Sequence, residues 1–152
     1  MDEEYEEEFR IFITHGRSEL WRDVARYIEK DLNVDTIELS EAANRGRTII
    51  QKLDEESDDC HFAIVILSAE DEISSGTLRA RQNVVHEIGF FQGKFGLDKV
   101  VFLKEEGVEW FSNIDGVVYE EFNKGYIRST FPRIQKEIEH ALEEWQSESD
   151  EE

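Results

Sequence analysis

The segment "HFAIVILS", residues 61 to 68, indicates the fold class of this chain. It is a short, nearly unbroken run of apolar residues, with several β-branched side chains. Such a run is typical of a strand that is buried on both faces, and strands of that kind belong to the middle of parallel sheets. We therefore expect a central strand here, with helices packed on both sides of the sheet.

On either side of this segment, β-rich runs alternate with helical patterns. This alternation is typical of βαβ units, so we predict an α/β fold with a mainly parallel five-stranded sheet between two helical layers, a flavodoxin-like three-layer sandwich. Ser18 is the expected N-cap of the first helix. The predicted strands are 9–15, 34–40, 61–68, 99–103 and 116–122, and the predicted helices are 19–32, 48–59, 79–96 and 127–145.

The chain has 152 residues, which fits a single domain. We expect this domain to span residues 9–145, between acidic tails at 1–8 and 146–152 that are predicted to be disordered. The only cysteine, Cys60, excludes an intramolecular disulfide, and its place beside a buried strand favours a packed thiol. With no secretory leader pattern and no long apolar run, we expect a soluble, cytoplasmic protein.

The formal net charge is −20, which argues against nucleic acid or an anionic membrane as a partner. The two tails account for ten acidic residues, so the body still carries −10. Only seven lysines occur in the whole chain. Because such a surface stays hydrated in concentrated salt, we hypothesise that the protein comes from a salt-adapted host.

In doubly wound sheets, ligands bind in the crevice outside the carboxyl ends of the strands, where the strand order reverses. Five of the ten arginines lie in loops predicted at this edge. Arginine binds phosphate through two parallel hydrogen bonds, so this clustering in an acidic chain favours a phosphate-bearing ligand, although pairing with neighbouring carboxylates remains an alternative. The candidate binding residues in the three loops are His15, Gly16 and Arg17; Asn44, Arg45, Gly46 and Arg47; and Ser68, Asp71, Arg79 and Arg81.

Common nucleotide-binding and phosphoacceptor motifs are absent. The chain has neither a P-loop nor a G-x-G-x-x-G motif, and Ser68 stands where a response-regulator receiver would have an aspartate. Its four histidines are not spaced as ligand pairs, so no metal site is predicted. The histidines are His15, His61, His86 and His140.

The predicted helix "RARQNVVHEIGFFQGKFG", residues 79–96, places a carboxylate beside its apolar face. Glu87 lies at the edge of that face, with Asn83 one turn earlier on the same side. One interpretation is that Glu87 faces solvent. The other is that Glu87 and Asn83 line the crevice near the arginines, where partial desolvation would strengthen the interaction of the carboxylate with a sugar hydroxyl or a developing cation. The apolar stripe comprises Ala80, Val84, Ile88, Phe91 and Phe95.

A lone carboxylate is sufficient for one kind of glycosidic chemistry. Most glycosidases need two carboxylates because the leaving alkoxide must be protonated. The nicotinamide of NAD+ is already cationic and leaves as a neutral base, so one carboxylate that stabilises the oxocarbenium-like sugar meets the requirement. The same residues would suit a deoxyribosyltransferase, an enzyme that cyclises ADP-ribose, or a nucleotide-binding adaptor module without turnover.

Three segments carry a resemblance to a known family: "FRIFITHGRSE…VARYIEK", "NRGRTIIQKLDEESDDCHFAIVILSAEDE" and "RARQNVVHEIGFFQGKFG…VVFL". Together they resemble the TIR-like predicted nucleotide-binding domains of prokaryotes, including those fused to bacterial STING domains in antiphage systems. The resemblance covers about residues 9–142 and implies a TIR fold with NAD+ glycohydrolase activity, NAD+ being the substrate and no cofactor being needed. It places the family's catalytic glutamate at Glu87. Many TIR enzymes have a tryptophan where this chain has Asn83.

The resemblance also implies how the activity is controlled. The segment "SEAANRGR" corresponds to the family's mobile loop after the second strand, which gates the site and contacts neighbouring subunits. We therefore expect a homo-oligomer when the protein is active. Fused relatives have a sensor domain for which this chain has no counterpart, so a separate sensor or regulatory protein is expected.

Overall fold

The computed structural model describes residues 8–15, 18–38, 45–69, 89–108 and 118–150. Within them lies a five-stranded sheet with the order β2-β1-β3-β4-β5, in which every neighbouring pair is parallel. The predicted flavodoxin-like α/β fold is thereby confirmed, and the segment at 61–68 supplies the central strand. The strands are β1 (Arg10–His15), β2 (Asp35–Glu38), β3 (Phe62–Leu67), β4 (Val100–Glu105) and β5 (Val118–Phe122).

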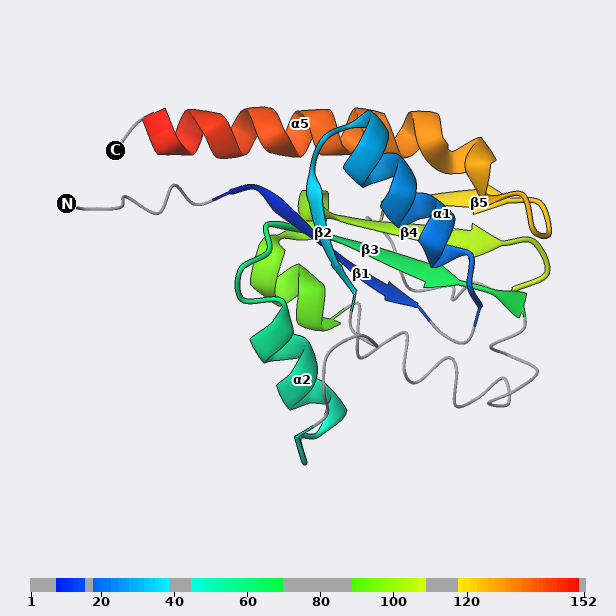
Figure 1. Ribbon diagram of the computed structural model, residues 1–152, viewed down its shortest axis with the longest axis horizontal. Coiled ribbons are helices and arrows are strands. Elements are labelled where there is room, and N and C mark those ends of the chain that lie inside the picture. Colours follow the sequence, from blue (N-terminus) through cyan, green and yellow to red (C-terminus); the bar gives the residue numbers. More distant parts are fainter. Residues whose placement is uncertain (1–7, 16–17, 39–44, 70–88, 109–117, 151–152) are drawn as a thin grey trace.

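Helices cover both faces of the sheet, as Figure 1 shows. Helices α1 (Trp21–Arg26) and α5 (Phe131–Asp150) lie on one face, and α2 (Ile49–Glu56) lies on the other with the helical residues 89–95. This is the arrangement that right-handed crossovers between parallel strands produce. The molecule therefore has the predicted three layers.

The apolar side chains of β3 alternate between two cores. Ile64 and Ile66 belong to the larger core, which includes Val24 of α1 and Ile138 of α5. Ala63 and Val65 belong to the smaller core, with Leu53 of α2 and the fully buried Phe91. Because a strand points successive side chains to opposite faces, a run without polar residues is what burial on both faces requires.

Helix α2 shows how local sequence sets an element's bounds. The hydroxyl of its N-cap Thr48 accepts the backbone N–H of Gln51 at 3.1 Å, and the Gln51 side chain accepts the N–H of Thr48 at 2.8 Å. This reciprocal pair is a capping box. The helix was predicted to run to residue 59, but it ends at Glu56, and the Ser57 hydroxyl donates to the carbonyl of Leu53 at 2.5 Å.

The predicted first helix, 19–32, differs from the structure in two ways. It begins at Trp21 with Leu20 as its N-cap, and the Ser18 hydroxyl instead accepts the N–H of Leu20 in the preceding turn. After Arg26 the chain continues as a π-helix, η1 (Tyr27–Asp31). Prediction from a 3.6-residue period does not distinguish these two helix types over a single turn.

The end of the last helix corrects the predicted domain boundary. A 3-10 turn, η4 (Ile127–Thr130), leads into α5, which continues to Asp150. Residues 146–150 are therefore helical and do not belong to a disordered tail. Trp145 packs against Phe9 and His61, with ring centroids 5.7 and 5.3 Å apart, and these contacts hold α5 to the body at Trp145. In the part of the chain that the structure describes, no helix has the length and apolarity to span a membrane.

Candidate functional site at the carboxyl edge of the sheet

The carboxyl ends of the parallel strands bring several polar side chains to one edge of the sheet. His15 ends β1, Glu38 ends β2, Ser68 follows β3, and Glu105 ends β4. Five of the predicted site residues lie in the described part: His15, Arg45, Gly46, Arg47 and Ser68. The predicted residues outside the described ranges are Gly16, Arg17, Asn44, Asp71, Arg79, Arg81, Asn83 and Glu87.

His15 and Glu38 form a close pair at this edge. Nε2 of His15 lies 2.6 Å from Oε1 of Glu38, and the two side chains are 9% and 3% exposed. Parallel strands β1 and β2 are in register at Ile13 and Glu38, so both side chains emerge at the same end of the sheet. The indole of Trp21 stacks on the imidazole, with ring centroids 5.1 Å apart and planes 15° apart.

The contact between His15 and Glu38 fixes the orientation of the imidazole ring. A carboxylate that binds one ring nitrogen of histidine sets the tautomer and the ring orientation, which leaves the other nitrogen in a defined place. The stacked Trp21 limits rotation of the ring, and the guanidinium of Arg22 lies 4.7 Å from the centroid of the Trp21 ring. The sequence predicted His15 as a site residue. It assigned no role to Glu38. The only feature of the sequence that could have indicated one is that a carboxylate stands near the end of a strand.

Glu105 is a second buried carboxylate that the sequence prediction missed. Its Oε1 accepts the N–H of Ala69 at 2.9 Å, and its Oε2 accepts the N–H of Gly125 at 3.1 Å. Gly125 has a φ of +75°, a conformation that favours glycine. Glu105 therefore joins the loop after β3 to the loop after β5. Ser68, which is 2% exposed, lies next to this junction.

The two described arginines after β2 contact carboxylates of α2. Arg47 Nη1 lies 2.8 Å from Glu55 and 2.9 Å from Glu56, and Arg45 Nη2 lies 3.5 and 4.0 Å from the same two residues. Desolvation opposes the charge on Arg47, but hydrogen bonds to Glu56 and Glu55 outweigh it and raise the pKa of Arg47. A phosphate would therefore share these guanidinium groups with α2 or displace its carboxylates. Between the arginines, Gly46 takes a φ of +70°.

The helical residues 89–95 continue the chain from Glu87. Phe91 is fully buried and contacts Phe12 of β1, with ring centroids 5.7 Å apart. Phe95 stacks on Phe91 at 5.9 Å. Phe91 and Phe95 thus lie on the predicted apolar stripe, whose remaining members fall outside the described residues. Residues 89–95 are therefore anchored on the sheet face, and Glu87 precedes them by two residues in the sequence.

Lys94 anchors the same segment to α2. Its Nζ donates to the backbone carbonyl of Asp54 at 2.7 Å and to the Ser57 hydroxyl at 2.9 Å. It also contacts the carboxylates of Asp54 and Asp58 at 3.2 and 2.9 Å. A cation near the last carbonyls of a helix complements the helix dipole. The two helices on this face are therefore connected at one end.

Comparison with known proteins gives one family match. The family model described as "CAP12/Pycsar effector protein, TIR domain" matches residues 10–124. "Uncharacterized protein YuaY" of Escherichia coli (strain K12) is 41% identical over 121 residues, which cover 76% of this chain and 40% of that protein. "Protein tirC" of Dictyostelium discoideum is 33% identical over 106 residues, 64% of this chain and 53% of that protein. The chain thus spans between two fifths and about half of these relatives.

Among solved structures, a crystal structure of a prokaryotic SEFIR domain aligns with 88% of this chain and 91% of that one. The sequence identity is 18% and the TM-score is 0.47. The fold assignment rests on the strand order and the parallel pairing of the sheet.

Proposed function

Because the chain belongs to the TIR-domain family of CAP12/Pycsar effector proteins, we propose that it is an NAD+ glycohydrolase that acts as an effector in antiphage defence. The reaction splits NAD+ into nicotinamide and ADP-ribose, linear or cyclic. The observation that carries the proposal is the family match over residues 10–124, a range that includes Glu87. The parallel sheet, whose carboxyl edge gathers His15 and Glu38, supports it.

Glu87 is the proposed catalytic residue. The bond between C1′ of the ribose and the pyridinium nitrogen breaks, and its electron pair returns to the ring nitrogen, so nicotinamide leaves neutral. The sugar that remains has oxocarbenium character, and a nearby carboxylate stabilises it electrostatically. The oxygen of water then bonds to C1′ and releases a proton, which gives linear ADP-ribose. No general acid is needed for the leaving group.

We propose that the polar groups at the carboxyl edge hold the rest of NAD+. The guanidinium groups bind the pyrophosphate, because Arg pairs with phosphate through two hydrogen bonds. The polar side chains near the strand ends contact the ribose or the nicotinamide, and the loop glycines allow close approach. The proposed pyrophosphate partners are Arg17, Arg45, Arg47, Arg79 and Arg81, and the other proposed contacts are His15, Gly16, Asn44, Gly46, Ser68, Asp71 and Asn83.

The active form is proposed to be a homo-oligomer controlled by a separate sensor protein. The matched region is 40% of one relative and 53% of the other, so the remaining segments of these proteins are one model for how such control is supplied. Purified alone, the chain is expected to have low activity until it is concentrated. No metal or cofactor takes part in this proposal.

A non-catalytic nucleotide-binding module is the second candidate. The ion pairs of Arg45 and Arg47 with Glu55 and Glu56 compete with a phosphate in either function, so the two candidates differ in turnover and not in these contacts. Such a module would bind NAD+ or a related nucleotide without releasing nicotinamide. Another N-glycosidic enzyme would instead require a different nucleoside substrate.

The experiment compares nicotinamide release from NAD+ by concentrated wild-type chain, by Glu87→Gln and by a matched control, in dilute and in molar salt. Glu87→Gln keeps the side-chain volume and removes the charge. Glu8→Gln is the control, because Glu8 is exposed and lies just before β1, at the opposite edge of the sheet. The proposal predicts release by the wild type and the control only. Tight nucleotide binding without release in all three would select the adaptor function.

A further inference from the structure

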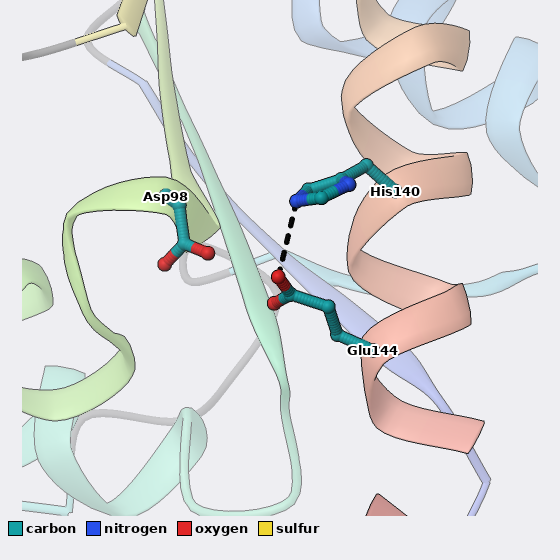
Figure 2. A group of neighbouring side chains, drawn as sticks. All are labelled: Asp98, His140 and Glu144. Atoms are coloured by element: carbon teal, nitrogen blue, oxygen red, sulfur yellow. Dashed lines mark ion pairs between the residues drawn. The ribbon is translucent and has the colours of Figure 1, made fainter. Parts of the chain in front are cut away.

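Three metal-ligating side chains meet far from the carboxyl edge of the sheet. Asp98 lies in the 3-10 turn η3 (Leu97–Lys99) that leads into β4, and His140 and Glu144 lie one turn apart on α5. One ligand atom from each lies within 4.8 Å of the other two. Figure 2 shows the imidazole and the Glu144 carboxylate directed at each other, with Asp98 across from them. His140 Nε2 is 3.1 Å from Glu144 Oε1.

Two of these side chains, His140 and Glu144, also border a hollow in the surface. It has a volume of about 480 Å³ and is lined by one imidazole, one hydroxyl and three carboxylates. The hollow gives room beside His140 and Glu144 for water ligands of an ion. The lining residues are His140, Glu143, Glu144, Ser147 and Glu148.

The charge on this part of α5 favours a cation. After Lys136 the helix contains no lysine or arginine, and its last turn has no basic residue. Acidic groups at the C-terminal end of a helix face the negative end of its dipole, and like charges one turn apart repel each other. Glu144 and Glu148 are such a pair. A bound cation would relieve both unfavourable interactions.

The structure contains a cation at this place already. The ammonium of Lys99 is hydrogen-bonded to Glu144 Oε2, and it lies 3.2 Å from Asp98 Oδ2. The two carboxylates are thus arranged as ligands of a positive charge.

We propose that Asp98, His140 and Glu144 bind a divalent transition-metal ion such as Zn²⁺, which displaces the ammonium of Lys99. An imidazole nitrogen with two carboxylates favours zinc or nickel over magnesium or calcium, which prefer oxygen ligands alone. The exchange is a substitution of one cation for another, with no redox step. The ion connects η3, at the start of β4, with the C-terminal half of α5. The spacing of histidines alone could not predict this site, because its other ligands are carboxylates.

The test is isothermal titration calorimetry of Zn²⁺ into the full chain, prepared without an affinity tag and freed of metal with a chelator. The variants His140→Ala and Glu144→Gln each remove one ligand. Glu139→Gln is the control, because it removes one charge from the same helix without lining the hollow. Lys99→Met removes the competing cation. The side chain of His140 is 56% exposed, so its replacement leaves the fold intact, which circular dichroism verifies.

We expect one Zn²⁺ per chain in the wild type. Each ligand variant should weaken binding by at least about tenfold, since even outer-shell partners of a metal act on that scale. The control should bind like the wild type, and Lys99→Met should bind several times more tightly. Equal affinity in wild type and His140→Ala would overturn the proposal, as would the absence of binding in both wild type and Lys99→Met. Unchanged binding in Lys99→Met alone would refute the role of Lys99.

Discussion

Nε2 of His15 lies 2.6 Å from Oε1 of Glu38, and both side chains are almost fully buried at the carboxyl ends of neighbouring strands. A hydrogen bond that involves a charged group stabilises a fold more than a neutral one does. Glu38→Gln keeps the volume and removes the charge, so we expect the free energy of unfolding to fall by about 1–3 kcal/mol. Urea denaturation measures the change. Glu8→Gln should be neutral, and equal stability of Glu38→Gln and wild type would mean that the charge contributes nothing.

Lys94 connects the helix that follows Glu87 to the C-terminal end of α2. Lys94→Met keeps most of the apolar stem but removes the ammonium from two carboxylates and one helix carbonyl. Asp54 and Asp58 are well exposed, so each ion pair contributes little, and we expect a loss of about 1 kcal/mol in total. Lys124→Met, at an exposed position after β5, is the matched control. A loss no larger than that of the control would show that the connection does not stabilise the fold.

Cys60 is buried, and burial raises the pKa of its thiol from 9.0 to about 12. Only thiolates react quickly with disulfide reagents, so the native thiol should react slowly at pH 8 and rapidly after unfolding. Because the pKa is higher in the native state than in the unfolded state, the protonated thiol contributes to the free energy of unfolding. This contribution is fully present below pH 9 and is lost as the pH rises towards 12. The loss is at most about 1.4 kcal/mol per pH unit.

The measurement for Cys60 is chemical denaturation between pH 8 and pH 11 in the wild type and in Cys60→Ala. Other groups titrate in this range in both proteins, so the difference between the two isolates the thiol. The wild type should lose stability more steeply. Parallel curves, or rapid labelling of the native thiol, would contradict the burial of Cys60.

The net charge of −20 predicts that salt stabilises the protein. Raising the ionic strength from about 0.1 M to 1 M shortens the screening length from roughly 10 Å to 3 Å, which weakens repulsion between carboxylates. The urea midpoint should therefore rise steadily between 0.05 and 2 M KCl. The acidic end of α5 is one place where this repulsion is concentrated. Equal midpoints at both ends of the range would refute adaptation to salt.

The fold could be predicted because the strongest signals in the chain are local. The unbroken apolar run of β3 requires burial on both faces. The helical sequence patterns between the strands predict helical crossovers, and such crossovers join strands that run parallel. The π-helix at Tyr27–Asp31 could not be predicted, because one turn of either helix type puts Ile28 in the core. The end of α5 was placed too early because its acidic composition resembled a tail, whereas the helix continues beyond Trp145, through the exposed residues 146–148, to Asp150.

The candidate site was predictable only in part. His15 ends one apolar strand and Ser68 follows another, so their position at the carboxyl edge was expected. Glu38 and Glu105 were missed because a carboxylate at the end of a strand resembles a solvated residue, and only the tertiary structure supplies their partners. The pairing of Arg47 with Glu55 and Glu56 was an open alternative in the sequence. Its role as a phosphate ligand stays a prediction, as does the role of Glu87.

Charge reversal tests the arginines directly. Arg45→Glu and Arg47→Glu remove two guanidinium groups and place carboxylates beside Glu55 and Glu56, so affinity for NAD+ should fall by at least about tenfold if they bind the pyrophosphate. Calorimetric titration with NAD+ gives the affinity. The double variant Arg26→Glu with Lys30→Glu, at exposed positions of α1 and η1, is the control because it changes the net charge by the same amount. Unchanged affinity in the double variant would exclude both residues as ligands.

Release of nicotinamide from NAD+ by the concentrated chain, compared between wild type and Glu87→Gln, decides whether this protein is an NAD+ glycohydrolase that depends on Glu87. We expect the wild type to form nicotinamide and ADP-ribose in equal amounts, and Glu87→Gln to be slower by about a hundredfold or more, the usual effect of removing one electrostatic stabiliser. Equal rates in the two proteins, under conditions in which the wild type is active and assembled, would contradict this expectation.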